Sequence, residues 1–256
     1  MCELFILLIA YMKIYRFINM KRIIIISILF LAFFVDSNAQ TVQNINALKF
    51  KELIAKGDYI LVDVRTPDEF SRGHIQGSTA INMADTGFPS KVALLQKDKT
   101  ILIYCLTGNR SSYAARYLIQ NGFKKVYNLQ NGIMDWSQQG FALEQSSQTV
   151  ASSSPAYTEQ SFNKLLKDNK LVLVDFHAVW CAPCKAMNPV IDKVSANFKG
   201  KAQVVKVDVE ANKTITTAWQ VQSVPGFVLF KEGKKVWSHN GTISYDDLAL
   251  AITKFI

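Results

Sequence analysis

The sequence is poor in the residues that define disulfide scaffolds, collagens and unfolded chains. Its 256 residues include four cysteines, six prolines and 12 glycines. Four cysteines are too few for a disulfide scaffold in a chain of this size. The low content of proline and glycine excludes a collagen-like or linker-like composition. Charged residues amount to 19% and hydrophobic residues to 49%, which excludes a disordered chain. The length indicates two domains of ordinary size.

The chain also lacks a concentrated block of positive charge. Its formal charge of +9 divides as +2, +3 and +4 over residues 1–39, 40–150 and 151–256. No basic stripe interleaved with aromatic residues occurs, so nucleic acid is not an expected partner.

The first 39 residues resemble a cleavable signal peptide. Lys21 and Arg22 precede the apolar run Ile23–Val35, and the small residues of Ser37-Asn38-Ala39 follow it. The run would reach only about 20 Å as a helix, short of the roughly 30 Å hydrocarbon core. We therefore expect export to the periplasm or beyond, with cleavage before Gln40 and with Met20 as an alternative true start.

A membrane anchor is the alternative for this leader, because residues 4–12 are also apolar. Basic residues interrupt the combined run, so the anchor ranks second. Contact with a membrane is then expected only through an uncleaved leader. No cysteine stands at the cleavage point, which leaves lipoprotein anchoring unsupported.

The remaining chain divides at residues 145–155, a segment with five serines and no periodic apolar pattern. We interpret it as a linker between domains at 40–144 and 156–256. Each flank alternates strand-like and helix-like patterns, which predicts two α/β domains, each a central β-sheet flanked by helices.

In the first domain a cysteine stands where an apolar strand ends. Residues 100–104 predict the strand, Cys105 follows, and an amphipathic helix begins near Arg110. A helix is also predicted over Ile45–Lys56, with Gly57 ending it. Ligands of open α/β sheets bind at such strand ends, and the amides of the turn would stabilise an anionic sulfur. A buried, inert cysteine is the alternative.

Three segments of this domain resemble the rhodanese (sulfurtransferase) family. They are Asp63–Phe70, Gly73–Gly77 and the loop Cys105-Leu-Thr-Gly-Asn-Arg110, whose Cys-x4-Arg spacing is that of sulfurtransferases rather than of related phosphatases. The resemblance implies that Cys105 attacks a sulfane-sulfur donor and carries the sulfur as a persulfide. It also implies an active loop that cradles this sulfur, formed by Leu106, Thr107, Gly108, Asn109 and Arg110.

Individual positions refine this expectation. Arg110 would hold the loop and an anionic substrate. Asp63 and Arg65 are expected to form a supporting ion pair, and His74 to be structural. Thiosulfate-using members commonly carry a basic residue where Leu106 stands, which argues against thiosulfate as donor.

In the second domain a Cys-x-x-Cys motif follows the apolar strand Leu171–Phe176 and starts a helix. This arrangement is typical of redox dithiols, in which the second cysteine can displace a mixed disulfide held by the first. Zinc is the alternative, but it needs four ligands. The chain has no second cysteine pair, and His177 and His239 have no metal-site spacing. No metal or other cofactor is expected.

The second domain resembles thioredoxin over nearly all of residues 158–256. The matching positions are Asp175 in its strand, Trp180-Cys181-Ala182-Pro183-Cys184, the strand lysine Lys206 and the cis-proline position Pro225. The resemblance implies that Asp175 manages the proton of Cys184 and that Pro225 presents backbone to a bound chain; a helix cap or surface carboxylate is the other interpretation of Asp175. Ala182 and Gly226 depart from the usual glycine and threonine.

The sequence therefore predicts an exported thiol and sulfur redox enzyme. Cys105 would accept sulfane sulfur, and the Cys181–Cys184 dithiol would reduce that persulfide or protein disulfides. Its partners would be a sulfane-sulfur donor, thiol or disulfide proteins, and an external reductant. One alternative is a disulfide oxidoreductase whose first domain only binds or senses. A pair of non-enzymatic scaffolds is the other.

Overall fold

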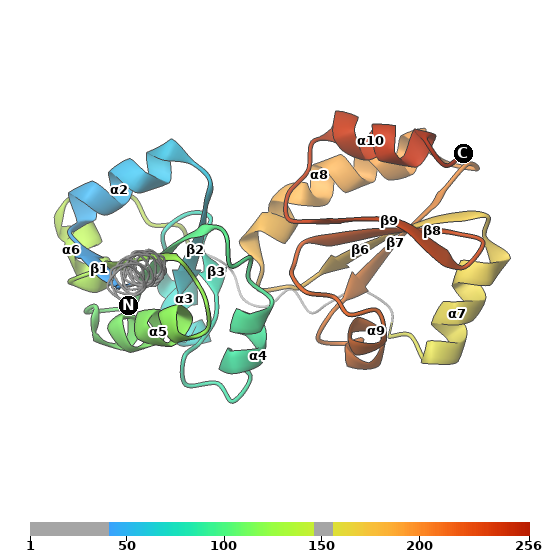
Figure 1. Cartoon of the computed structure of the whole chain (residues 1–256). Helices are drawn as coiled ribbons and strands as arrows, with labels where there is room; N and C mark the ends of the chain where they lie inside the picture. The colour runs from blue at the N-terminus through green and yellow to red at the C-terminus, as the bar shows by residue number, and fades with distance from the viewer. Residues whose placement is uncertain (1–40, 146–155) are drawn as a thin grey trace, which may run out of the picture. The chain divides into compact units, whose positions relative to one another are not determined.

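The computed structural model describes residues 41–145 and 156–256 (Figure 1). The predicted leader, and the predicted linker apart from Gln145, lie outside the described residues. Each described segment contains a β-sheet with helices on both faces. This confirms the predicted fold class, and the two domains are described separately.

The first domain is built on a parallel sheet of five strands in the order β1-β5-β4-β2-β3. Strands β2 and β4 lie inside the sheet, and their residues are almost all buried. A parallel sheet covered on both faces needs such continuous apolar strands. The strands are β1 (Gln43–Ile45), β2 (Tyr59–Asp63), β3 (Thr79–Ala80), β4 (Thr100–Tyr104) and β5 (Lys125–Leu129).

Two pairs of helices cover this sheet. Helices α2 (Ala47–Lys56) and α6 (Gly132–Gln138) pack on one face through Phe50 and Trp136. Helices α4 (Phe88–Ala93) and α5 (Asn109–Gln120) share a core with the opposite side chains of β2 and β4. Helix α3 (Pro67–Arg72) follows β2 directly. Successive strand side chains alternate between the two cores.

The start of this domain differs from the prediction. Ile45 belongs to strand β1, which pairs with β5, and the helix begins only at Ala47. Asn46 separates the two elements because its side chain accepts a hydrogen bond from the backbone N–H of Lys49 and so caps the helix. The predicted end is correct, since Gly57 is the C-cap.

The second domain contains a mixed sheet of four strands in the order β7-β6-β8-β9. Strand β6 is parallel to β7 and antiparallel to β8, and β8 and β9 form a hairpin. The strands are β6 (Leu171–His177), β7 (Gln203–Asp208), β8 (Gly226–Lys231) and β9 (Lys234–Asn240).

Helices cover both faces of this sheet as well (Figure 1). On one face, α8 (Ala182–Asn197) and α10 (Tyr245–Thr253) share a core with Leu173 and Leu229. On the other face, α7 (Glu159–Asp168) and α9 (Lys213–Ala218) pack through Phe162 and Ile215. No helix within residues 41–145 or 156–256 has the length and apolar character that crossing a membrane requires.

Candidate active sites

Cys105 lies at the carboxyl end of β4, where the chain turns into α5. Its Sγ accepts a hydrogen bond from the backbone N–H of Gly108 at 3.2 Å. The hydroxyl of Ser111, in the first turn of α5, lies 3.4 Å from the same sulfur. Both groups can stabilise negative charge on the sulfur, which a nucleophilic thiolate requires.

Two glycines allow the active loop to fold against the segment that follows β5. Gly108 has a φ of 89°, and a Cβ there would lie 1.8 Å from the carbonyl oxygen of Gln130. Gly132 has a φ of 63°, and its Cβ would lie 2.3 Å from the carbonyl oxygen of Leu106. The loop is also held by the backbone N–H of Ile133, which donates to Cys105 O at 2.8 Å. Only glycine fits at the two positions.

Arg110 is bound by a carboxylate from another element. Its two terminal nitrogens donate to the oxygens of Glu69, on α3, at 2.8 and 2.6 Å. Glu69 also accepts from the backbone N–H of Thr66, in a capping box that starts α3. The Arg110 hydrogen bonds lower the pKa of Glu69 to about 2, so the pair stays ionised at neutral pH. The expected role of Arg110 toward an anionic substrate stays a prediction.

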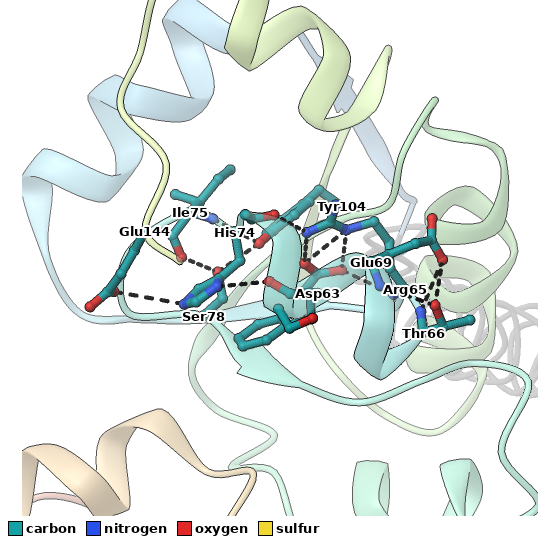
Figure 2. Close-up of polar contacts among 12 residues, drawn as sticks. Asp63, Arg65, Thr66, Glu69, His74, Ile75, Ser78, Tyr104 and Glu144 are labelled. Carbon is teal, nitrogen blue, oxygen red and sulfur yellow. Dashed lines mark hydrogen bonds and ion pairs between the residues drawn. The ribbon is translucent and has the colours of Figure 1, made fainter. Parts of the chain in front are cut away.

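Asp63 and Arg65 form an ion pair beside Tyr104, as Figure 2 shows. Arg65 Nη2 donates to Asp63 Oδ2 at 2.6 Å and to the carbonyl oxygen of Gly73 at 2.7 Å. The guanidinium lies 5.6 Å from the ring centre of Tyr104, the residue that pairs with Asp63 across β2 and β4. The pair thus joins the end of β2 to the residue before Cys105.

A second set of buried contacts ties the Gly73–Ser78 turn to β4. The hydroxyl of Tyr104 accepts from the backbone N–H of Ile75 at 3.0 Å and lies 2.9 Å from Ser78 Oγ (Figure 2). His74 stacks on Phe70 with 3.8 Å between ring centres, and its Nδ1 lies 3.1 Å from the carbonyl oxygen of Phe70. These contacts involve the turn and β4 rather than the sulfur of Cys105.

In the second domain Cys181 and Cys184 form a disulfide at the start of α8. Cys181 is the N-cap residue, and its Sγ accepts from the backbone N–H of Cys184 at 3.1 Å. Pro183 stands in the first turn, where a missing N–H does not interrupt the helix. The indole of Trp180 donates to Glu210 at 2.8 Å. An N-terminal helix position stabilises a thiolate once the disulfide is reduced.

Asp175 lies in the middle of β6 and is 3% exposed. Burial raises its pKa to about 7, although the charge of Lys206, its neighbour on β7, lowers that pKa. Lys206 itself donates to Asn188 at 2.8 Å. An apolar strand therefore holds a carboxyl group that can exchange a proton near neutral pH.

The bond between Val224 and Pro225 is cis and leads directly into β8. Gly226, one of the two departures from the thioredoxin pattern, pairs with Phe176 on β6. A Cβ at Gly226 would lie 2.8 Å from the carbonyl oxygen of Ser223, closer than real Cβ atoms approach backbone. A threonine at this position would therefore require the backbone after Gln222 to move.

Three contacts of these sites were not predicted from the sequence. Glu69 binds Arg110, Ser111 approaches Cys105, and Glu210 accepts from Trp180. Glu69 does lie within one of the segments that resemble rhodanese, but nothing local links it to a residue 41 positions away. The Ser111 hydroxyl could have been found, since it follows Arg110 directly and falls in the first helical turn.

Comparison with known proteins assigns a family to each domain. The rhodanese-like domain family matches residues 46–139, and the thioredoxin family matches residues 153–254. Thioredoxin from Pyropia yezoensis is 35% identical over 100 residues, which are 39% of this chain and 94% of that protein. Thioredoxin from Synechocystis is 34% identical over 106 residues, 41% of this chain and 99% of that protein.

Chloroplastic thioredoxin Y from rice, Oryza sativa subsp. japonica, is 41% identical over 92 residues. These 92 residues are 36% of this chain, and the match covers only 55% of the length of the rice protein. The similarity to all three relatives extends over one domain only. Together with the Cys181–Cys184 disulfide at the start of α8, it supports the assignment of the second domain. The chain belongs to the thioredoxin family through its second domain, which follows a rhodanese-like domain.

Proposed function

We propose that the chain is an exported enzyme of thiol and sulfur chemistry. Cys105 accepts a sulfane sulfur as a persulfide, and the Cys181–Cys184 dithiol reduces that persulfide or protein disulfides. The observation that carries the proposal is the environment of Cys105 Sγ, which faces the Gly108 N–H at 3.2 Å and the Ser111 hydroxyl at 3.4 Å. The Gly108 N–H would stabilise a Cys105 thiolate, and so would the Ser111 hydroxyl when it turns to the sulfur from the carbonyl oxygen of Gly108, 3.1 Å away.

Cyanide-dependent formation of thiocyanate tests the first half of the proposal. The wild-type chain forms thiocyanate when supplied with a sulfane-sulfur donor, and Cys105→Ser abolishes it while Cys181→Ser does not. Reduction of insulin disulfides tests the second half and has the opposite dependence on the two variants. If no donor produces thiocyanate while insulin is reduced, the first domain is a binding or sensing module and the chain is a disulfide oxidoreductase.

The two sites are further proposed to act in sequence on one sulfur atom. The thiolate of Cys181 attacks the outer sulfur of the Cys105 persulfide, which returns Cys105 as a thiolate and leaves the persulfide on Cys181. Cys184 then attacks Cys181 Sγ, which forms the disulfide and releases hydrosulfide. The persulfide is reduced, the dithiol is oxidised, and an external reductant restores the dithiol.

Sites on one chain can meet at effective concentrations of about millimolar. Single-turnover release of sulfide should therefore be faster from the intact chain than from a micromolar mixture of Cys105→Ser with Cys181→Ser. Each of these full-length variants retains only one of the two sites. Equal rates would show two independent catalysts on one chain.

Export is part of the proposal and rests on the leader sequence. The mature protein is expected to begin at or near Gln40 in the periplasm or medium, and a retained leader would instead anchor it to the membrane. N-terminal sequencing of protein recovered outside the cytoplasm tests this. Residues before Ile23 in that protein would contradict cleavage.

A further inference from the structure

The active loop around Cys105 has very little net charge. Residues 105–112 and 129–134 contain a single charged side chain, that of Arg110. Both of its terminal nitrogens bond to the Glu69 carboxylate. Since the pKa of Glu69 is lowered to about 2, the carboxylate stays charged at any pH at which the protein works. The cation of the loop is therefore neutralised within the protein.

The first domain has three other arginines, and two of them, Arg65 and Arg116, cannot replace Arg110. Arg65 is buried and bonded to Asp63. Arg116 lies six residues farther along α5, about 9 Å along the helix axis, and its guanidinium sits 4.5 Å from the ring centre of Tyr113. An anionic donor approaching Cys105 would meet neither of them as a free counter-charge.

Apolar side chains border the loop instead. Leu106 follows Cys105 and is 41% exposed, and Met134, at the start of α6, is 47% exposed. The two are neighbours, because the backbone N–H of Met134 donates to the carbonyl oxygen of Leu106 at 3.2 Å. Leu106 and Met134 form what we call the apolar rim. Each offers surface whose burial by an apolar ligand is favourable.

We propose that the sulfur donor of Cys105 is a persulfide on an uncharged, apolar carbon skeleton, selected over anionic donors such as thiosulfate by the Glu69–Arg110 pair and the apolar rim. The inference rests on the proposed function of Cys105. The Cys105 thiolate attacks the outer sulfur of the neutral donor R–S–SH. A new S–S bond forms, the donor S–S bond breaks, and R–S⁻ leaves with the electron pair. The transferred sulfur keeps its proton, and there is no net oxidation.

Two donors that differ by one charge test this directly. Freshly generated benzyl persulfide and 4-carboxybenzyl persulfide have the same reacting group, and thiosulfate serves as a second anion. The full-length chain carries Cys181→Ser and Cys184→Ser, so that transferred sulfur accumulates on Cys105. Stopped samples are read by mass spectrometry for the gain of one sulfur. We expect benzyl persulfide to react about fivefold or more faster than its carboxylated analogue.

Glu69→Gln exposes the charge of Arg110 while keeping a side chain suited to the capping box. It should lower the ratio of benzyl to carboxybenzyl rates about tenfold and should accelerate thiosulfate. Glu52→Gln is the matched control, because it removes the same charge from an exposed pair with Lys49 on α2. The control should leave the ratio at its wild-type value.

Met134→Gln tests the apolar rim. It should slow benzyl persulfide about threefold or more and leave thiosulfate unaffected. Leu48→Gln, which alters an exposed leucine of α2, is its control and should change neither rate.

The possible failures are distinct. If Cys105 takes up sulfur but the carboxylated donor or thiosulfate reacts as fast as benzyl persulfide, the donor class is wrong and the proposed function stands. If Glu69→Gln leaves the ratio of benzyl to carboxybenzyl rates unchanged, the ion pair does not cause that ratio, and the inference is overturned. If no donor adds sulfur to Cys105, the proposed function itself fails, and the inference fails with it.

Discussion

The carboxylate of Asp63 and the guanidinium of Arg65 form a buried ion pair, with 2.6 Å between Oδ2 and Nη2. Their side chains are 0% and 5% exposed, respectively. Arg65 also donates to the carbonyl oxygen of Gly73. The pair therefore joins the end of β2 to the turn after α3, and its guanidinium lies beside Tyr104, the residue before Cys105.

Asp63→Asn is expected to destabilise the first domain by about 3 kcal/mol, because it leaves the Arg65 charge buried without a counter-charge. Native-state hydrogen exchange of peptides covering β2 and β4 measures the loss. Glu52→Gln, which breaks the exposed pair with Lys49, is the control and should change nothing measurable. Equal effects of the two variants would contradict a structural role for the buried pair.

The stability of the second domain should fall as pH rises through the neutral range. The pKa of Asp175 is about 7 in the folded protein and near 3.8 when the chain is unfolded, so the folded state binds the extra proton between these values. The contribution of Asp175 to the stability of the domain is therefore greatest below about pH 4. It decreases between about pH 4 and pH 7 and is constant above that range.

Asp175→Asn should abolish this dependence and stabilise the domain by roughly 2–4 kcal/mol at about pH 8. Urea titrations at about pH 5 and pH 8, followed through methyl signals of the second domain, compare the variant with wild type. If wild type is equally stable at both values, the carboxyl group is not protonated in the folded protein.

Cys184→Ser should trap mixed disulfides with partner proteins, and Cys181→Ser should not. Cys181 is the N-cap of α8 and accepts the Cys184 N–H at 3.1 Å, so its sulfur is the better stabilised thiolate. Non-reducing electrophoresis after alkylation measures the trapped species. More trapping by Cys181→Ser would reverse the assignment of attacking and resolving cysteines.

Gly108→Ala should slow alkylation of Cys105 by iodoacetamide between about tenfold and a hundredfold, because displacing a reacting group by about 1 Å has effects of that size. The added Cβ would lie 1.8 Å from Gln130 O, so the loop must move. Gly140→Ala is the matched control, since Gly140 has a similar φ of 71° but open space around it. Its rate should stay within about twofold of wild type, the substitution adding only backbone strain.

The sequence by itself determined the features that depend on residues close together in the chain. The apolar runs of β2 and β4 identify buried parallel strands because both sides of each strand meet a core. Cys105 after β4 and Cys181 before α8 place the sulfur atoms at a strand end and at a helix start. Thr158 caps the start of α7 in a similarly local way, since capping involves only the next three residues.

Tertiary structure decided what depends on residues far apart. Glu69 reaches Arg110 across 41 positions, and the Gln130 carbonyl explains why Gly108 must be glycine. Neither contact has a local sequence signal, because each depends on how α3 and the end of β5 pack beside the loop. The pKa of Asp175 near 7 has the same origin: its charge is penalised by the core around β6, and only the packed domain creates that environment.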